Sequence, residues 1–322
     1  MQHMTKRLLG LLGAICLAYG QTGAVSGPSA GYVFDPSIKG LRQIRGIPGA
    51  ALLGDPLEVG ITLAAAEIAP RGDSAIATAS DGSVHLLRLQ NGVATEIAAK
   101  DLLQSPSRVV YSPSGSSAAI LGAGSVQILK GLPGMPDVGH SLTVPSAPDA
   151  AAQAAASATR RVNRPSAAVS DDGSCVLIVR DKSVVLLTNP GGIRVLTDAH
   201  GAAAVAFAPG GRDAAVVTGG TLSLFQDVAG ASTRQDFPNA GAAAALAFSA
   251  DGGKVLIAGP RAVEVLDRAT GARASAECDC RLEGLSPMGN FFRLNEAGAG
   301  PLWLLDTTSE PKLFFVPAKP GA

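Results

Sequence analysis

The chain contains 322 residues, of which 26 are Lys or Arg and 26 are Asp or Glu, and 47% of the residues are hydrophobic. This balance of charge excludes the strongly basic surface that is typical of nucleic-acid-binding proteins. A charged fraction of only 16% also excludes a main body that is disordered. The length alone suggests two domains, although a repeat array of this length can close into one.

The N-terminal residues have the pattern of a secretory signal peptide. Lys6 and Arg7 precede an apolar run over residues 8–19, and small residues follow. The run is shorter than the about 20 residues that a transmembrane helix needs. We therefore predict a signal peptide over residues 1–24, export to the periplasm or the exterior, and no membrane span after its removal.

Two cleavage positions remain open, after Gly20 and after Ala24. Cys16 at the end of the apolar run raises the alternative of a lipid anchor. Ile15, however, stands where a lipoprotein signal has Gly, Ala or Ser. We expect no lipid at Cys16, and a single mature domain over residues 25–322.

A short phrase recurs along the chain and consists of a small apolar run, a Ser/Ala-Pro/Asp-x-Gly turn and a second apolar run. Its six copies are EIAPRGDSA (67–75), VYSPSGSSA (110–118), AVSDDGSCV (168–176), AFAPGGRDA (206–214), AFSADGGKV (247–255) and GLSPMGNFF (284–292). The aligned glycines are Gly72, Gly115, Gly173, Gly211, Gly252 and Gly289, with spacings of 43, 58, 38, 41 and 37 residues. A period of about 40 residues is that of one propeller blade. The sequence therefore predicts an all-β protein, a β-propeller of four-stranded antiparallel blades.

The copy around Gly252 shows how one blade is built. Short segments with period-2 alternation at residues 244–248, 254–258, 262–266 and 272–278 predict its four strands. Glycines in the turns between them supply positive φ without steric cost.

The segment over residues 31–60 has strand and turn character and nearly the length of a blade. We interpret it as a divergent first blade, which makes seven. The alternative is a six-bladed propeller with this segment as an N-terminal extension.

The long spacing of 58 residues contains an Ala-rich segment over residues 145–165. A helix of one or two turns would be marginal there in isolation. We predict a surface excursion between blades. Arg160, Arg161 and Arg164 offer contacts to an anionic partner, but a solvated loop is the simpler interpretation.

Three cysteines remain after signal removal, and an odd number argues against a disulfide framework. Two of them, Cys278 and Cys280, flank Asp279. In a strand their side chains would share one face, with Cα atoms near the upper limit for bridging. We favour two half-buried thiols, and a local disulfide is the alternative.

The repeats resemble the exported bacterial β-propellers of the YVTN and WD-like repeat type over residues 31–317. Those proteins share a Ser-Pro-Asp-Gly turn and a Val-x-Val-x-Asp-x-x-Thr-Gly ending. The segments that match best are AFSADGGKVLIAGPRAVEVLDRATGA (247–272) and VSDDGSCVLIVRDKSVVLL (169–187). The Gly-His opening and Trp-Asp ending of WD repeats are missing. The resemblance implies a fold and no particular activity, because such propellers include scaffolds, binding proteins and enzymes.

In a propeller, the connections between second and third strands and between blades open on one face, where ligands are expected. The polar candidates at these places are Asp81, Arg180, Asp181, Lys182, His200, Arg261 and Glu296. The histidines of the mature chain are not at equivalent positions of the repeat, and a Gly-x-Ser-x-Gly elbow is absent. We therefore predict no catalytic residues, no metal ligands and no cofactor.

These observations favour an exported, non-catalytic propeller that acts as a scaffold for a protein or peptide partner. We expect it to bind no nucleic acid and to be a monomer. The alternative is a hydrolase or lactonase-like enzyme with a carboxylate-bound metal, such as calcium, in the central channel. A third hypothesis is a component of an envelope assembly. The sequence leaves the question of catalysis open and leans against an enzyme.

Overall fold

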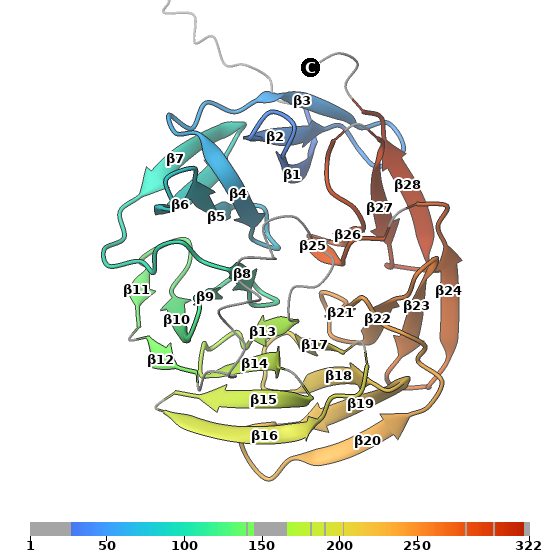
Figure 1. Cartoon of the computed structure of the whole chain (residues 1–322). Helices are drawn as coiled ribbons and strands as arrows, with labels where there is room; N and C mark the ends of the chain where they lie inside the picture. The colour runs from blue at the N-terminus through green and yellow to red at the C-terminus, as the bar shows by residue number, and fades with distance from the viewer. Residues whose placement is uncertain are drawn as a thin grey trace, which may run out of the picture.

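The computed structural model describes residues 27–139, 141–144, 166–180, 182–189, 191–201, 203–280, 282–298 and 300–318. They form seven antiparallel sheets that stand around a common centre as the blades of a propeller (Figure 1). The prediction of a seven-bladed propeller is confirmed, and the six-bladed alternative is wrong. The predicted signal peptide and the Ala-rich excursion lie outside the described residues. Within the described residues, no helix has the length and apolar character to cross a membrane.

The first three blades are built from the N-terminal part of the chain. Their strands are β1 (Ser29–Asp35), β2 (Gly40–Arg45) and β3 (Leu52–Pro56); β4 (Leu63–Ile68), β5 (Ser74–Ala79), β6 (Val84–Gln90) and β7 (Val93–Ile97); and β8 (Arg108–Tyr111), β9 (Ser117–Leu121), β10 (Ser125–Lys130), β11 (Asp137–Val138) and β12 (Leu142–Thr143). In the third blade two short strands, β11 and β12, both pair with β10.

The remaining four blades follow the four-stranded plan. Their strands are β13 (Ala167–Val169), β14 (Cys175–Arg180), β15 (Ser183–Thr188) and β16 (Gly192–Asp198); β17 (Ala204–Phe207), β18 (Ala214–Thr218), β19 (Thr221–Gln226) and β20 (Thr233–Phe237); β21 (Ala245–Phe248), β22 (Lys254–Ala258), β23 (Ala262–Asp267) and β24 (Arg273–Glu277); and β25 (Ser286–Met288), β26 (Phe291–Arg293), β27 (Leu302–Asp306) and β28 (Lys312–Val316).

The first blade is divergent in a specific way, because it has three strands instead of four. After β3, residues 57–62 return to the start of β4 without forming a ladder of their own. Leu57, Val59 and Ile61 alternate along this return and pack against the apolar cluster that the first blade shares with the second. The segment thus packs at the interface between the first and second blades and adds no fourth strand.

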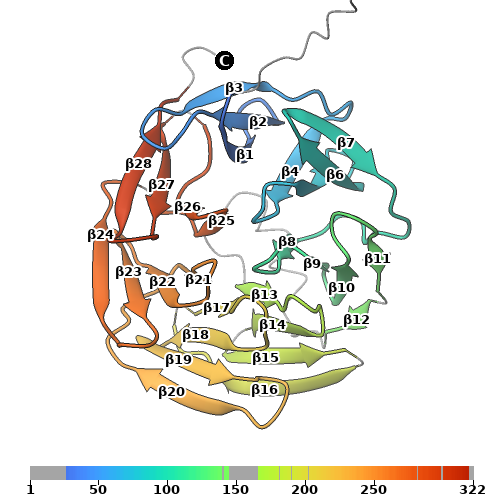
Figure 2. The ribbon, with the colours of Figure 1, turned by 180° about the vertical axis from the view of Figure 1, so that it is seen from behind.

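The ring closes between the N-terminal and C-terminal blades, which lie side by side in both views (Figures 1 and 2). Met288 of β25 packs against Gly31 of β1, where a Cβ atom would come within 3.3 Å of the methionine methyl group. Gly31 has a φ of 135°, so both its backbone and its surroundings favour glycine at this close approach.

The core is divided among the interfaces between blades. Each neighbouring pair of blades shares one buried apolar cluster, so that the clusters follow one another around the ring. Most members are Ala, Val, Leu and Ile, which fit where flat sheets approach closely. Small apolar residues on short alternating strands are therefore what this architecture requires.

Candidate functional site

The propeller has two faces with different construction. Because neighbouring strands are antiparallel, successive turns of a blade lie at opposite ends of it. Turns between first and second strands, and between third and fourth strands, lie on what we call the repeat-turn face. Turns between second and third strands, with the links that join the four-stranded blades, lie on what we call the loop face.

The repeated phrase forms the same turn in most blades. In the fourth blade, the amide of Gly173 donates to the Ser170 carbonyl at 2.9 Å, and the amide of Ser170 donates to the Cys175 carbonyl at 3.0 Å. In the fifth blade the positive φ is at Gly210 (73°) and not at Gly211, which the sequence alignment had matched to the other glycines. The Ala-Pro-Gly-Gly sequence offers two glycines, and the turn uses the first.

The repeat turns also connect one blade to the next. Asp171 accepts two hydrogen bonds from Ser114 of the third blade, from its amide at 2.7 Å and from its hydroxyl at 2.6 Å. Its other carboxylate oxygen accepts from the amide of Gly210 in the fifth blade at 2.6 Å. One side chain thus joins three blades at their repeat turns.

Similar bonds continue around the ring. The guanidinium of Arg71 donates to the carbonyl of Ser114 at 2.7 Å, which joins the second blade to the third. Arg268 forms an ion pair with Asp213 at 3.2 Å between the sixth and fifth blades. On the same face, the amide of Gly289 in the last blade donates to the Pro70 carbonyl at 2.7 Å in the second. The repeat-turn face is therefore braced from blade to blade.

The predicted site residues are spread over the loop face. Arg180 and Lys182 flank the turn between β14 and β15, while Asp181 lies outside the described residues. His200 follows β16, and its amide donates to the Thr218 hydroxyl at 2.8 Å. Arg261 lies between β22 and β23. Arg180 and Lys182 share the fourth blade, whereas His200 lies in the link to the fifth blade and Arg261 in the sixth, so the structure places these residues on one face without gathering them into a single cluster.

Glu296 lies in the connection between β26 and β27 in the last blade. Its amide donates to a carboxylate oxygen of Glu283 at 3.0 Å, so the connection is tied to the link that precedes β25. Nearby, Trp303 is half-buried and its ring lies 5.8 Å from that of Phe315. The single tryptophan therefore packs within the last blade.

Asp81 belongs to a chain of polar side chains that the sequence did not reveal. Its carboxylate accepts from the Ser83 amide at 2.9 Å and from the Ser83 hydroxyl at 2.6 Å. Ser83 Oγ lies 2.8 Å from His85 Nε2, and His85 Nδ1 lies 2.7 Å from Glu96 Oε1. The hydrogen bond from the Ser83 side chain holds the pKa of the Asp81 carboxyl below its usual value.

The order Ser83, His85, Glu96 is that of a nucleophile, a base and an orienting acid. The single hydroxyl proton of Ser83, however, is shared between Asp81 at 2.6 Å and His85 at 2.8 Å. A hydroxyl that donates to the Asp81 carboxylate does not donate to the His85 imidazole, as an activated nucleophile would. The amide of Ser83 is also held by Asp81, so it does not point to a developing oxyanion. The arrangement fits a cross-linked turn better than an activated nucleophile.

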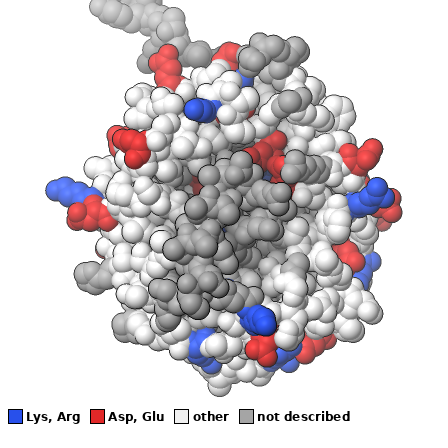
Figure 3. Space-filling model, viewed as in Figure 1, with Lys and Arg blue, Asp and Glu red and all other residues white. Residues whose placement is uncertain are grey.

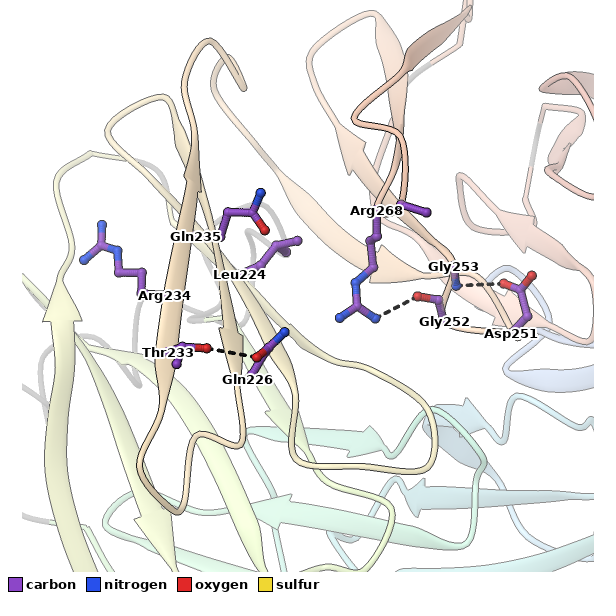
Figure 4. Close-up of a pocket in the computed structure, with 10 residues that line it drawn as sticks. Leu224, Gln226, Thr233, Arg234, Gln235, Asp251, Gly252, Gly253 and Arg268 are labelled. Carbon is purple, nitrogen blue, oxygen red and sulfur yellow. Dashed lines mark hydrogen bonds between the residues drawn. The ribbon is translucent and has the colours of Figure 1, made fainter.

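A pocket of about 380 Å³ lies between the fifth and sixth blades on the repeat-turn face. Gln226 and Gln235 face Arg268 across it, whereas Arg234 projects from the other side of its strand (Figure 4). Arg268 is held in place by the Gly252 carbonyl at 2.9 Å and by the ring of Phe248 at 5.4 Å. The pocket thus offers two amides and one fixed cation, a lining suited to a polar ligand.

Neither surface charge nor metal-ligating side chains mark a further site among the described residues. In the view of Figure 3, charged side chains form small groups of mixed sign, most of them towards the rim. Among the described residues, no group of three or more His, Cys, Asp or Glu side chains is arranged to hold a metal ion.

The cysteines differ from the favoured prediction. Cys278 and Cys280 are joined in a disulfide with Cα atoms 5.0 Å apart, whereas two thiols were expected. The pair follows the end of β24, where the chain leaves the ladder and can bring the two sulfur atoms together. Cys175 is a buried free thiol.

Comparisons with known proteins identify the fold only. No protein-family model and no curated protein sequence matches the chain. Among solved structures, a functionally unknown protein from Desulfotomaculum acetoxidans is similar, with a TM-score of 0.58 and 12% identity over 89% of this chain and 99% of that one. A chain of Kuenenia stuttgartiensis hydrazine synthase is similar with a TM-score of 0.52 and 15% identity over 94% of this chain and 100% of that one. At such low identity the similarity establishes a β-propeller fold and no activity.

Proposed function

We propose that the protein is an exported, monomeric, non-catalytic propeller that binds a protein or peptide partner on its loop face. The observation that carries this proposal is the difference between the two faces. On the repeat-turn face, polar groups form hydrogen bonds between blades, as Asp171 does with Ser114 and Gly210. The loop face carries connections that differ from blade to blade and presents them on a rigid support, an arrangement common in binding proteins.

The lengths of these connections support the proposal. The turn between β18 and β19 has only Gly219 and Gly220, whereas the connection between β26 and β27 spans positions 294–301. The link between β7 and β8 spans residues 98–107. Loops of unequal length and mixed charge suit recognition of one protein surface better than recognition of a repetitive polyanion.

Charge reversal on the loop face tests the proposal. Lys182 and Arg261 are exposed there, and each is tied to its blade through its backbone carbonyl, so their side chains can be changed without removing those bonds. We expect the double variant Lys182→Glu/Arg261→Glu to lose, at least tenfold, a partner that the wild-type chain retains from the exported fraction. The matched control is Lys312→Glu on the outer strand β28 of the last blade, which should retain it. Equal retention by all three proteins would contradict binding on the loop face.

Export is supported by two independent features. The first is the basic and apolar pattern of residues 1–24, and the second is the Cys278–Cys280 disulfide, because disulfides persist mainly in oxidising compartments. Mass spectrometry of the protein recovered from the producing cells should find a mature N-terminus after Gly20 or Ala24. Recovery of the chain with its first residues intact in the cytosol would contradict export.

The repeats are further proposed to be of the YVTN and WD-like type. The ending around Asp267 has the chemistry that the motif requires, because the carboxylate accepts from the amides of Ala269 at 3.0 Å and Thr270 at 2.8 Å. The motif residues thus form the turn between the third and fourth strands.

A further inference from the structure

The Cys278–Cys280 disulfide is not explained by partner binding. Cys278 directly follows β24, and its amide still donates to the Arg261 carbonyl at 2.9 Å. Cys280 begins the link to β25 in the next blade. The bridge therefore lies at the loop-face end of the interface between the sixth and seventh blades.

The two sulfur atoms have different environments. Cys278 is only 5% exposed and belongs to the buried cluster with Phe292 and Leu294. Cys280 is partly exposed and packs against that cluster from outside. Cys280 is therefore the more accessible of the two residues, and we expect an incoming thiolate to attack its sulfur and not that of the buried Cys278.

The bridge contributes little to holding the blades together. It closes a ring of residues only two apart in sequence, and so short a loop restricts the unfolded chain far less than a long one. The sixth blade is paired from β21 to β24 without it, and its cluster with the seventh blade includes Leu256, Val263 and Leu305. The disulfide can therefore open while the fold persists.

We propose that Cys278–Cys280 is a thiol–disulfide exchange site that oxidises a dithiol of a partner peptide or protein. The partner's first thiolate attacks Cys280 Sγ and forms a mixed disulfide, while the Cys278–Cys280 bond breaks and its electron pair leaves with Cys278 Sγ. The partner's second thiolate then attacks its own sulfur in the mixed disulfide and releases the Cys280 thiolate. The partner loses two electrons and gains a disulfide, and the two cysteines take up the two protons as thiols.

No other cysteine of the described residues competes in this exchange. Cys175 is fully buried between the fourth and fifth blades. Burial raises the pKa of its thiol, so it remains protonated and unreactive at neutral pH. It is also a built-in reporter, because reagents reach it only when the structure opens.

Reduction of the native protein tests the proposal directly. The purified chain is incubated with dithiothreitol at neutral pH, desalted rapidly to remove the reductant, alkylated with excess maleimide under native conditions and examined by peptide mass spectrometry. We expect labels on Cys278 and Cys280, none on Cys175, and unchanged circular dichroism. Labelling of all three cysteines at the same dithiothreitol concentration would show that the bridge opens only on unfolding and would overturn the proposal.

Single variants test the order of the two sulfur atoms. In Cys278→Ser the remaining Cys280 thiol should form a mixed disulfide with oxidised glutathione at least about tenfold faster than the Cys278 thiol does in Cys280→Ser. Equal rates, or a faster reaction of Cys278, would contradict the proposed point of attack.

A third measurement concerns the reaction itself. The wild-type protein should oxidise a reduced synthetic peptide containing two cysteines, at one peptide disulfide per chain, and Cys278→Ser/Cys280→Ser should not. Failure of the wild-type protein to oxidise the peptide would overturn the proposal even if the variants do not fold. The Lys182 and Arg261 variants leave the cysteines in place, so this failure is distinct from failure of partner binding.

Discussion

Replacing Asp171 with Ala removes the side chain that joins three blades at their repeat turns. The substitution deletes the acceptor for the Ser114 amide and hydroxyl and for the Gly210 amide. The backbone carbonyl of Asp171 still accepts from the hydroxyls of Ser116 and Ser117 at 2.9 and 2.8 Å. The variant therefore tests the connections made by one carboxylate without dismantling the turn.

The expected loss follows from the surroundings of the three bonds. Two of them are partly buried and one is exposed. Hydrogen bonds to charged groups contribute about 1.5–3 kcal/mol when shielded from water, and solvent reduces this in partly exposed positions. About 1 kcal/mol for each partly buried bond and about 0.5 kcal/mol for the exposed one give about 2.5 kcal/mol in the free energy of unfolding. For a domain of this size the thermal midpoint should fall by about 3–5 °C.

Urea denaturation and differential scanning calorimetry measure the loss. The matched control is Asp251→Ala, which removes a carboxylate that bonds only within its own turn, to the Ser249 hydroxyl and the Gly253 amide. It should cost less than about 1 kcal/mol, because both bonds are local, one partly buried and one exposed, and neither joins two blades. Combining Asp171→Ala with Ser114→Ala should cost clearly less than the sum of the single losses, because the two residues share a bond. Equal losses for Asp171→Ala and Asp251→Ala, or additive losses in the double variant, would refute bracing between blades.

Three further outcomes follow from the structure. Gly82→Ala should lower the thermal midpoint far more than Gly284→Ala, because Gly82 has a φ of 88° and its new Cβ would clash with Ser105 Oγ, whereas nothing lies within 4 Å of the Cβ position of Gly284. Equal effects would contradict the described turn. The thermal midpoint of the mature chain should be the same with added calcium and with chelator, and a calcium-dependent rise measured by calorimetry would favour the metalloenzyme alternative. Burial raises the pKa of Asp172 but hydrogen bonds, led by that from the Ser170 hydroxyl, outweigh it and bring the pKa to about 2 from 3.8. The ionised carboxylate therefore adds about 1 kcal/mol to the free energy of unfolding, after allowance for solvent screening, and this contribution is complete above pH 3.8 and lost as the pH falls towards 2. Asp172→Asn should lack that part of the acid transition in urea titrations. An unchanged pH profile would show the carboxylate to be uncoupled from folding.

Much of the fold could be predicted from the sequence, because each blade repeats the same turn residues and strand pattern. The predicted strands around Gly252 match β21 to β24 within two residues, since turn residues and period-2 alternation are local signals. The three-stranded first blade was harder to foresee. Leu57, Val59 and Ile61 alternate as a strand would, and only the packed structure shows that they line the interface with the second blade without forming a fourth strand.

The polar contacts were less predictable, because they join residues that are distant in sequence. Asp171 reads as an ordinary turn residue, and its partners Ser114 and Gly210 are 57 and 39 residues away. His85 alternates along β6 in the way that any strand residue does. Glu96 reaches it from β7 along the diagonal of the sheet, since the partner of Glu96 in the ladder is Leu87. The spacing of two between Asp81, Ser83 and His85 was the one available signal, because alternate residues share a face.

The pocket between the fifth and sixth blades shows the same limit. Gln226 and Gln235 meet Arg268 only because the two sheets are inclined to each other around the ring. No local sequence pattern predicts that these residues line one pocket. The candidates on the loop face, by contrast, were found from their place in the repeat alone.

Site-specific photo-crosslinking tests the central claim most directly. A photoreactive amino acid is placed at Lys182 or Arg261 on the loop face, or at Gln90 on the repeat-turn face, and the protein is irradiated in the exported fraction. Binding on the loop face predicts one crosslinked protein that is common to positions 182 and 261 and missing from position 90. Crosslinking from position 90 alone would contradict the account.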